Sequence, residues 1–390
     1  MVNKEFINKE VNNREDINRE VINKERMIAE FLQLAAIDSL SGNERQMADT
    51  IKNILSSLGI ESCEDDASKA AGGNAGNVFA RIKGNKDVPP ILLMAHMDTV
   101  APGIGKKPVI EGDIIKTDGT TVLGGDDLAG VECILEVIKV IKENNITHGD
   151  IEVLFTVAEE SGLVGVKHFD FGKSQAKYCF VLDGGVEIGK VSLIVPSHNK
   201  IDVEIIGKAS HAGVEPEKGI NAIAVAAKAI ANMRIGRIDE ETTANIGIIN
   251  GGQATNIVCD RVAIKGEARS RNMDKLQEQT KHMKECFAKA AEEAGAKLEF
   301  HAELEYPAYN IPKDSQIVNI LKKAASQSSL ELICEATGGG SDANIVNDRG
   351  IPAVVLSVGM DKVHSVEEQI KISDLAKAAE FLLNIIKCVE

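Results

Sequence analysis

The feature that most constrains the fold is the alternation of apolar strands with helices along the first half of the chain. Residues 91–95 and 178–182 are apolar throughout, as in strands buried on both faces, and residues 151–156 form a third strand. Residues 131–141 have the pattern of a helix between the first and the next of these strands. This alternation predicts an α/β fold with a central mixed, largely parallel sheet covered by helices.

A different order of elements interrupts that alternation. Strands and helices follow the β-α-β-β-α-β order of a ferredoxin-like unit, at residues 201–206, 219–233, 243–249, 261–269, 273–294 and 297–305. The α/β pattern then resumes with helices over 315–326 and 372–386 around a strand over 353–358. We therefore expect one domain (197–307) inserted into another (27–196 and 308–390), because domain termini often lie close together. The charged, weakly repetitive residues 1–26 are expected to form a peripheral, partly helical extension.

Composition excludes several classes of protein. The net charge of −15, the 3% of aromatic residues and the lack of Trp argue against a nucleic-acid partner. Seven widely spread cysteines without a CxxC pair indicate reduced, buried thiols rather than disulfides or a thiolate metal site. No apolar stretch could span a bilayer, and residues 1–26 lack the apolar core of a secretion signal. We expect a cytoplasmic protein that does not bind membranes.

Acidic and imidazole side chains follow the predicted buried strands, at the sheet edge where ligands commonly bind. In His96-Met97-Asp98 both polar side chains share one face of an extended segment, so Asp98 could fix the tautomer of a metal-binding His96. The pair could equally be a surface or capping pair. Four further places carry such groups, namely Asp126-Asp127, Glu159-Glu160, Asp183 and His364. Each has an ordinary explanation when taken alone, such as a helix cap, a solvated turn or a surface histidine.

Taken together, these side chains form the ligand set of a two-metal site. Two histidines and three carboxylates can hold two cations, with one carboxylate shared between them, and one glutamate is left over as a base. Nitrogen and oxygen donors without a thiolate suit zinc, and cobalt and manganese accept the same donors.

From about residue 27 onward, these motifs resemble, in order, those of the co-catalytic di-zinc exopeptidases. This family includes peptidase T, aminoacylase and succinyl-diaminopimelate desuccinylase, and the chain is most similar to its peptidase T-like members. The resemblance implies a zinc held by His96, Asp126 and Asp183, and a second zinc held by Asp126, Glu160 and His364. It also implies that Glu159 is the general base and that Asp98 orients His96, while Asp127 supports the site or caps a helix.

The inserted domain carries further similarities to the family. Gly207-Lys208-Ala209-Ser210-His211-Ala212-Gly213 is similar to the lid motif, which implies that His211 stabilises the oxyanion. Asn256 and Arg269 resemble lid residues that contact the substrate, and Gly339 lies in a glycine-rich loop whose amides approach it. The resemblance also implies that the inserted domain is a lid over a catalytic domain formed by 27–196 and 308–390, and that a homodimer forms through the lid. From the residues alone, His211 could be a surface residue, Arg269 a salt-bridge partner and the glycine loop a hinge.

Two departures from the peptidase T pattern remove positive charge near the expected pocket. Leu128 stands where those members commonly have Lys, and the stretch that begins at Thr337 lacks their Arg. The resemblance implies a tripeptide aminopeptidase-like enzyme that attacks short peptides with a zinc-bridged water and Glu159 as base. One alternative is an aminoacylase or deacylase acting on N-acyl amino acids. The other is a non-catalytic metal-binding protein, which would have no chemical need for Glu159.

Overall fold

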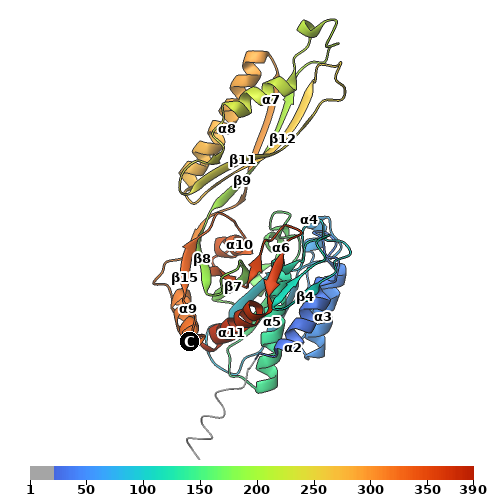
Figure 1. Ribbon diagram of the computed structural model, residues 1–390. Helices are drawn as coiled ribbons and strands as arrows, with labels where there is room; N and C mark the ends of the chain where they lie inside the picture. Colours follow the sequence, from blue (N-terminus) through green and yellow to red (C-terminus); the bar gives the residue numbers. More distant parts are fainter. Residues whose placement is uncertain (1–21) are drawn as a thin grey trace, which may run out of the picture. The chain divides into compact units, whose positions relative to one another are not determined.

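The computed structural model describes residues 22–390, so residues 1–21 of the predicted N-terminal extension lie outside the described part (Figure 1). The chain divides into two compact units. Unit 1 comprises the residues up to Val191 together with Asp314–Ile333 and Val355–Glu390, and unit 2 comprises Ser192–Lys313 and Cys334–Val354. The roles of catalytic domain and lid remain predictions for these two units.

The sheet of unit 1 is built around three buried strands. β3 (Ile91–His96) pairs in parallel with both β6 (Ile151–Thr156) and β7 (Tyr178–Gly184). β2 (Val78–Ile82) adds to β6 in antiparallel orientation, and β1 (Ser62–Glu64) adds to β2 in the same way. β16 (Ala353–Ser357) lies next to β7 on the other side. The predicted α/β fold with a mixed central sheet is therefore confirmed, and β3 pairs in parallel with both of its neighbours.

Helices form a packed layer over this sheet. α5 (Gly125–Asn144) contacts β3 and β7, and α2 (Lys24–Ala35) and α11 (Ile372–Lys387) pack against α5 (Figure 1). Because neighbours surround α5, its residues are buried almost continuously from Leu128 to Ile141. This packing holds the first residues of α5 at the sheet edge where β3 and β7 end.

A smaller sheet in unit 1 positions the last loop of the site. Its order is β17-β18-β5-β4, and its strands span Met360–Asp361, Gln369–Lys371, Ile114–Lys116 and Val109–Glu111. The remaining elements of unit 1 are α3 (Arg45–Ser57), α4 (Ala67–Ala71), α6 (Val164–His168), the 3-10 turn η2 (Phe171–Lys173) and α9 (Gln316–Gln327).

Unit 2 contains an antiparallel five-stranded sheet in the order β10-β11-β12-β9-β13. Its strands are β10 (Gly236–Arg237), β11 (Thr242–Gly251), β12 (Arg261–Ser270), β9 (Ser197–Ile206) and β13 (Lys297–Tyr306). Helices α7 (Ala222–Ala231) and α8 (Met273–Ala294) pack together on one face of this sheet (Figure 1). The order along the chain is β-α-β-β-α-β, with the two-residue strand β10 added.

The other elements of unit 2 lie outside the five-stranded sheet. They are β8 (Lys190–Val195), η3 (Pro216–Lys218), β14 (Tyr309–Asn310), β15 (Ile333–Ala336) and α10 (Asp342–Asp348). β14 pairs with β8 in antiparallel orientation, and β15 also pairs with β8.

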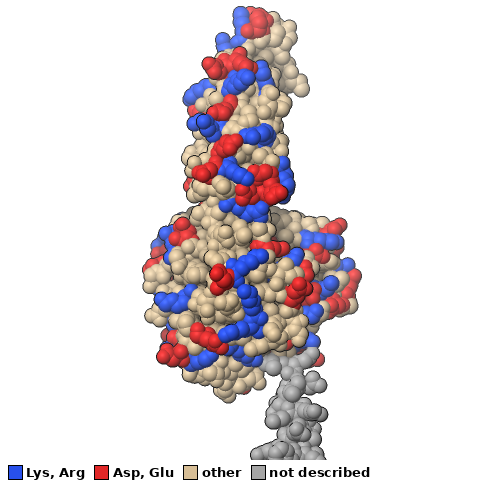
Figure 2. Space-filling model, turned by 90° about the vertical axis from the view of Figure 1, so that its left-hand side faces the viewer, with Lys and Arg blue, Asp and Glu red and all other residues tan. Residues whose placement is uncertain are grey.

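The surface and the cysteines bear on the expected class of protein. Figure 2 shows acidic and basic side chains interspersed over the visible face, unlike the continuous basic surface that binds a phosphate backbone. Among the described helices, none is both long and apolar enough to cross a membrane. All seven cysteines are free. Cys63 is exposed and Cys286 and Cys334 are only partly buried, so the prediction of buried thiols is wrong for these three residues.

A buried acid in the helical layer predicts an effect of pH on stability. Glu132 of α5 is fully buried, and neither of its carboxylate oxygens has a hydrogen-bond partner among the described residues. Burial, followed by repulsion from Glu30 and Glu136, raises the pKa of Glu132 well above its ordinary value, against the opposing charges of Lys139 and Arg26. The fold therefore keeps this carboxyl protonated at a pH where the unfolded chain ionises it.

We expect Glu132→Gln to stabilise unit 1 by an amount that grows with pH. Because the folded protein binds the extra proton, the wild-type free energy of unfolding falls as pH rises from the ordinary pKa of glutamate towards the raised pKa. Over that window the variant should gain about 1.4 kcal/mol per pH unit relative to wild type. Urea unfolding followed by circular dichroism at several pH values measures this gain. Glu143→Gln, which changes a half-exposed residue of the same helix, is the control; parallel curves for Glu132→Gln and wild type would contradict the expectation.

Candidate metal centre and active site

His96 is the last residue of β3, and its buried ring lies between two acidic side chains. Its Nδ1 is 3.0 Å from the main-chain oxygen of Asp98 and 3.4 Å from the Asp98 carboxylate. Its Nε2 is 3.0 Å from Oδ1 of Asp126. If Nδ1 donates its proton to Asp98, Nε2 presents a lone pair towards the Asp126 side, as a metal-binding histidine requires.

Asp98 is fully buried and connects three segments of unit 1. Its Oδ1 accepts a hydrogen bond from the main-chain N–H of Glu159 at 2.9 Å. Its Oδ2 accepts one from the main-chain N–H of Glu160 at 3.2 Å and one from the Ser41 hydroxyl at 2.6 Å. The predicted partner of His96 therefore also fixes the backbone of the two adjacent glutamates.

The two adjacent aspartates at the start of α5 have different surroundings. The carboxylate of Asp126 lies between two imidazoles, with Oδ1 3.0 Å from Nε2 of His96 and Oδ2 3.2 Å from Nε2 of His364. The buried Asp127 instead accepts main-chain hydrogen bonds, from His96 at 3.2 Å and from Gly130 at 3.1 Å. The supporting and capping contacts expected of Asp127 are therefore both present.

The remaining predicted ligands complete the cluster in unit 1. His364 places its Nε2 2.7 Å from Oε1 of Glu160. Asp183 is the next-to-last residue of β7. It has a carboxylate oxygen within 4.8 Å of ligand atoms of both His96 and Asp126. The described residues contain three groups with metal-ligand spacing, namely His96–Asp126–Asp183, Asp126–Glu160–His364 and His96–Glu159–Glu160. The first two have the same members as the two predicted ligand sets.

The electrostatics of this cluster suit cations. A hydrogen bond to Asp126, and then one to Glu160, raises the pKa of His364 to about 10. Burial opposes protonation of His96, yet Asp126 and Asp98 raise its pKa well above the ordinary value. Burial alone would raise the pKa of Asp126, but His364 and His96 lower it overall. The cluster thus favours positive charge beside the carboxylates, and its nitrogen and oxygen donors fit zinc.

Unit 2 holds the other predicted residues in two places. The exposed His211 and Asn256 are neighbours in the fold. His211 forms a β-bridge with Ile257, and the Ala212 N–H donates to the main-chain oxygen of Asn256 at 2.9 Å. Arg269 of β12 pairs with Glu267 through Nη2 at 3.0 Å, so the salt-bridge alternative for this residue is present.

Arg269 also reaches the glycine-rich loop. Its Nη1 donates to the main-chain oxygen of Gly338 at 3.4 Å, next to Gly339. The Gly339 N–H donates to the Thr337 hydroxyl at 3.3 Å. Glu267, the ion-pair partner of Arg269, is ionised. His198, and then Arg269, lower the pKa of Glu267 to about 2, although burial opposes this shift.

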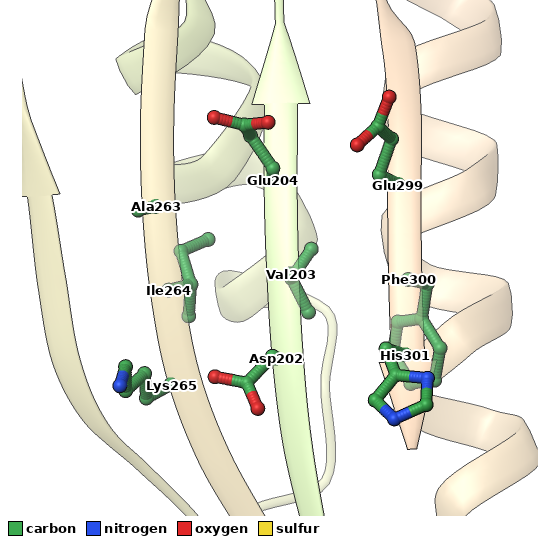
Figure 3. Close-up of a pocket in the computed structure, with 9 residues that line it drawn as sticks. All are labelled: Asp202, Val203, Glu204, Ala263, Ile264, Lys265, Glu299, Phe300 and His301. Carbon is green, nitrogen blue, oxygen red and sulfur yellow. The ribbon is translucent and has the colours of Figure 1, made fainter.

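A hollow on the sheet of unit 2 lies apart from these predicted residues. It has a volume of about 360 Å³ and is formed by side chains of three neighbouring strands (Figure 3). Its lining residues are Asp202, Val203, Glu204, Ala263, Ile264, Lys265, Glu299, Phe300 and His301. Since none of them belongs to a group with metal-ligand spacing among the described residues, the cluster of unit 1 remains the candidate site.

Three residues of the site were missed by sequence reasoning. The first is Ser41, whose hydroxyl donates to Asp98. The buried Glu44 accepts hydrogen bonds from Ala158 at 3.1 Å and Gly42 at 2.9 Å, and thereby holds the residue before Glu159. Glu368 accepts three hydrogen bonds from the start of α5. The only local signal was the acidity of Val366-Glu367-Glu368 after His364.

Comparisons with known proteins show which family the chain is similar to. A model of the peptidase family M20/M25/M40 matches residues 92–387. A peptidase T of Clostridium perfringens is 30% identical over 408 residues, which cover 92% of this chain and 97% of that protein. The crystal structure of aminopeptidase PepT from Bacillus cereus matches with a TM-score of 0.84 and 43% identity, over 94% of this chain and 99% of that one. A tripeptidase structure from Staphylococcus aureus matches with a TM-score of 0.89 and 40% identity, over 94% and 98%. The predicted resemblance is confirmed.

Proposed function

Since the chain belongs to peptidase family M20/M25/M40, and is therefore a hydrolase, we propose that it is a two-metal exopeptidase that cleaves short peptides. The observation that carries the proposal is the position of the Asp126 carboxylate between His96 and His364, with Glu159 and Glu160 beside it. We propose zinc as the metal, held by His96, Asp126 and Asp183 and by Asp126, Glu160 and His364. The aminopeptidase and tripeptidase names of the two similar solved structures support a peptide substrate.

The catalytic steps assigned to this chain are proton transfers by Glu159. When bound, the two metal ions would polarise the substrate carbonyl and lower the pKa of water. Glu159 takes a proton from the attacking water and passes it to the leaving amine. Glu159 is only 8% exposed, and its main-chain N–H donates to Asp98, which holds the backbone at this residue in place. Asp98 keeps His96 oriented at the same time.

We assign the substrate contacts to unit 2. His211 is proposed to donate a hydrogen bond to the developing oxyanion, and Asn256, Arg269 and the amide of Gly339 to contact the substrate. His211 is exposed; an unchanged kcat in His211→Ala would exclude this role. We also propose a homodimer formed through unit 2, which sedimentation would test, and a cytoplasmic location, which cell fractionation would test.

Removing the metals is expected to abolish hydrolysis, and zinc is expected to restore it. The purified protein would be dialysed against a chelator, reloaded with zinc, cobalt or manganese, and assayed with dipeptides, tripeptides and N-acetyl amino acids. Metal content would be measured on the same samples. We expect about two zinc ions per chain at full activity and the highest kcat/KM for peptides with a free amino terminus.

Other outcomes of the panel separate the alternatives. Preference for N-acetyl amino acids over peptides would identify an acylase that uses the same metals. Two bound metals without hydrolysis of any amide would indicate a metal-binding protein. Activity that survives complete removal of metal would exclude the two-metal mechanism.

A further inference from the structure

One buried carboxylate joins the two segments that carry Asp126 and His364. Glu368 is 1% exposed and lies under the loop that begins α5. Its Oε2 accepts hydrogen bonds from the main-chain N–H groups of Leu123 at 2.7 Å and Gly124 at 2.8 Å. Its Oε1 accepts a third from the N–H of Asp126 at 3.0 Å. These three N–H groups come before the regular part of α5, because Asp126 and Asp127 have non-helical backbone angles, and the Glu368 carboxylate satisfies all three of them.

The loop is shaped to receive this carboxylate. A Cβ on Gly125 would lie 3.2 Å from Oε1 of Glu368, which is tighter than nine in ten such contacts. Gly124 has a φ of +77° and would place a Cβ 2.8 Å from the Thr99 side chain, so this position also favours glycine. The lack of a side chain at Gly125 therefore allows the close approach between the backbone and Glu368.

The other end of the connection is equally well fixed. Glu368 immediately precedes β18, which pairs with β5 in the small sheet, and it follows His364 by four residues. His364 has a φ of +61°, a conformation that a histidine keeps only when its surroundings hold it there. Glu368 anchors the end of that loop to the backbone of Asp126.

We infer that Glu368 is a positioning residue that sets the geometry between Asp126 and His364. Asp126 is the only side chain common to the two proposed ligand sets, so a displacement of its backbone would disturb both metal positions. The inference rests on the proposed two-metal function and deepens it. Glu368 touches neither substrate nor metal in this assignment, and it acts through the main chain of Asp126.

Glu368→Gln tests the inference. The NH2 group of the glutamine must face at least one of the N–H groups that now donate to the carboxylate. At least one attractive contact therefore becomes repulsive. We expect zinc affinity to fall about 10- to 100-fold, as for other groups that orient metal ligands, with kcat lowered more than KM is raised. Hydrogen exchange of the amides over 122–127 should be faster even in the metal-free protein. Competition with a chromophoric chelator, peptide hydrolysis and exchange mass spectrometry measure these three quantities.

Glu367→Gln is the matched control, because Glu367 is the preceding residue in the chain and its side chain is 73% exposed. Glu368→Asp keeps the charge but is one methylene shorter, and it takes the place of the Gln variant if that variant does not fold. If wild type binds zinc and cleaves peptides, but Glu368→Gln has the same zinc affinity and amide exchange as Glu367→Gln, the inference is overturned and the proposed function stands. A wild type that binds no zinc and cleaves no amide would overturn the proposed function as well.

Discussion

Replacing Glu159 with Gln is expected to lower kcat by about 10²- to 10⁴-fold while the protein keeps both metal ions. The amide is nearly the same size as the carboxylate but cannot accept a proton from water at neutral pH. The backbone contacts should survive, because the Glu159 N–H still donates to Asp98 and the preceding Ala158 N–H still donates to Glu44. The measurements are steady-state hydrolysis of the best peptide and metal content of the same preparation.

The neighbouring glutamate provides the contrast for this experiment. Glu160→Gln removes one of the two carboxylates that contact His364 and should lower metal content as well as activity. Glu159 also shares a group of ligand spacing with His96 and Glu160, so it could itself hold a metal. Loss of metal in Glu159→Gln would assign it that role, and a wild-type rate would exclude it as the base.

The candidate site was predictable where its members lie at the ends of strands. His96, Asp183 and the Glu159-Glu160 pair each follow an apolar run, and strands that run parallel bring their carboxyl ends to one edge. The helices and strands of unit 2 were also predictable, since the spacing of apolar residues within each element is a local property of the sequence. The helix predicted over 131–141 extends over Gly125–Asn144, because burial on all sides removes the one-sided pattern that would show its ends.

The supporting residues were not predictable because their contacts are distant in sequence. Glu368 meets Leu123 across 245 positions, and Glu44 meets Ala158 across 114. A single acidic residue in a polar turn has no periodic pattern. The backbone N–H groups that could donate to it exist at every position except proline, so the sequence does not indicate its partners. The division into units is also not local. Cys334–Val354 groups with unit 2 although the sequence placed it in the catalytic domain, since the grouping depends on which segments meet after folding.

The two adjacent aspartates at the start of α5 should respond very differently to the same substitution. Asp126→Asn replaces one oxygen of the carboxylate between His96 and His364 with an NH2 group, which cannot bind a cation. Because both proposed ligand sets share this side chain, we expect metal content to fall from two ions to one or none per chain. The loss in kcat should then be about 10³-fold or more, since activation of water and carbonyl depends on both ions.

Asp127→Asn should be milder, because both Asp127 oxygens accept main-chain hydrogen bonds within the fold. The amide loses one of these contacts, and we expect zinc affinity to fall by about tenfold, near the lower end of the range for groups that orient ligands. Zinc titration of the two variants, with circular dichroism to establish that both are folded, distinguishes a shared ligand from a supporting residue. Equal losses in the two variants would place Asp127 among the ligands, and retention of two tightly bound ions in Asp126→Asn would remove the shared carboxylate from the mechanism.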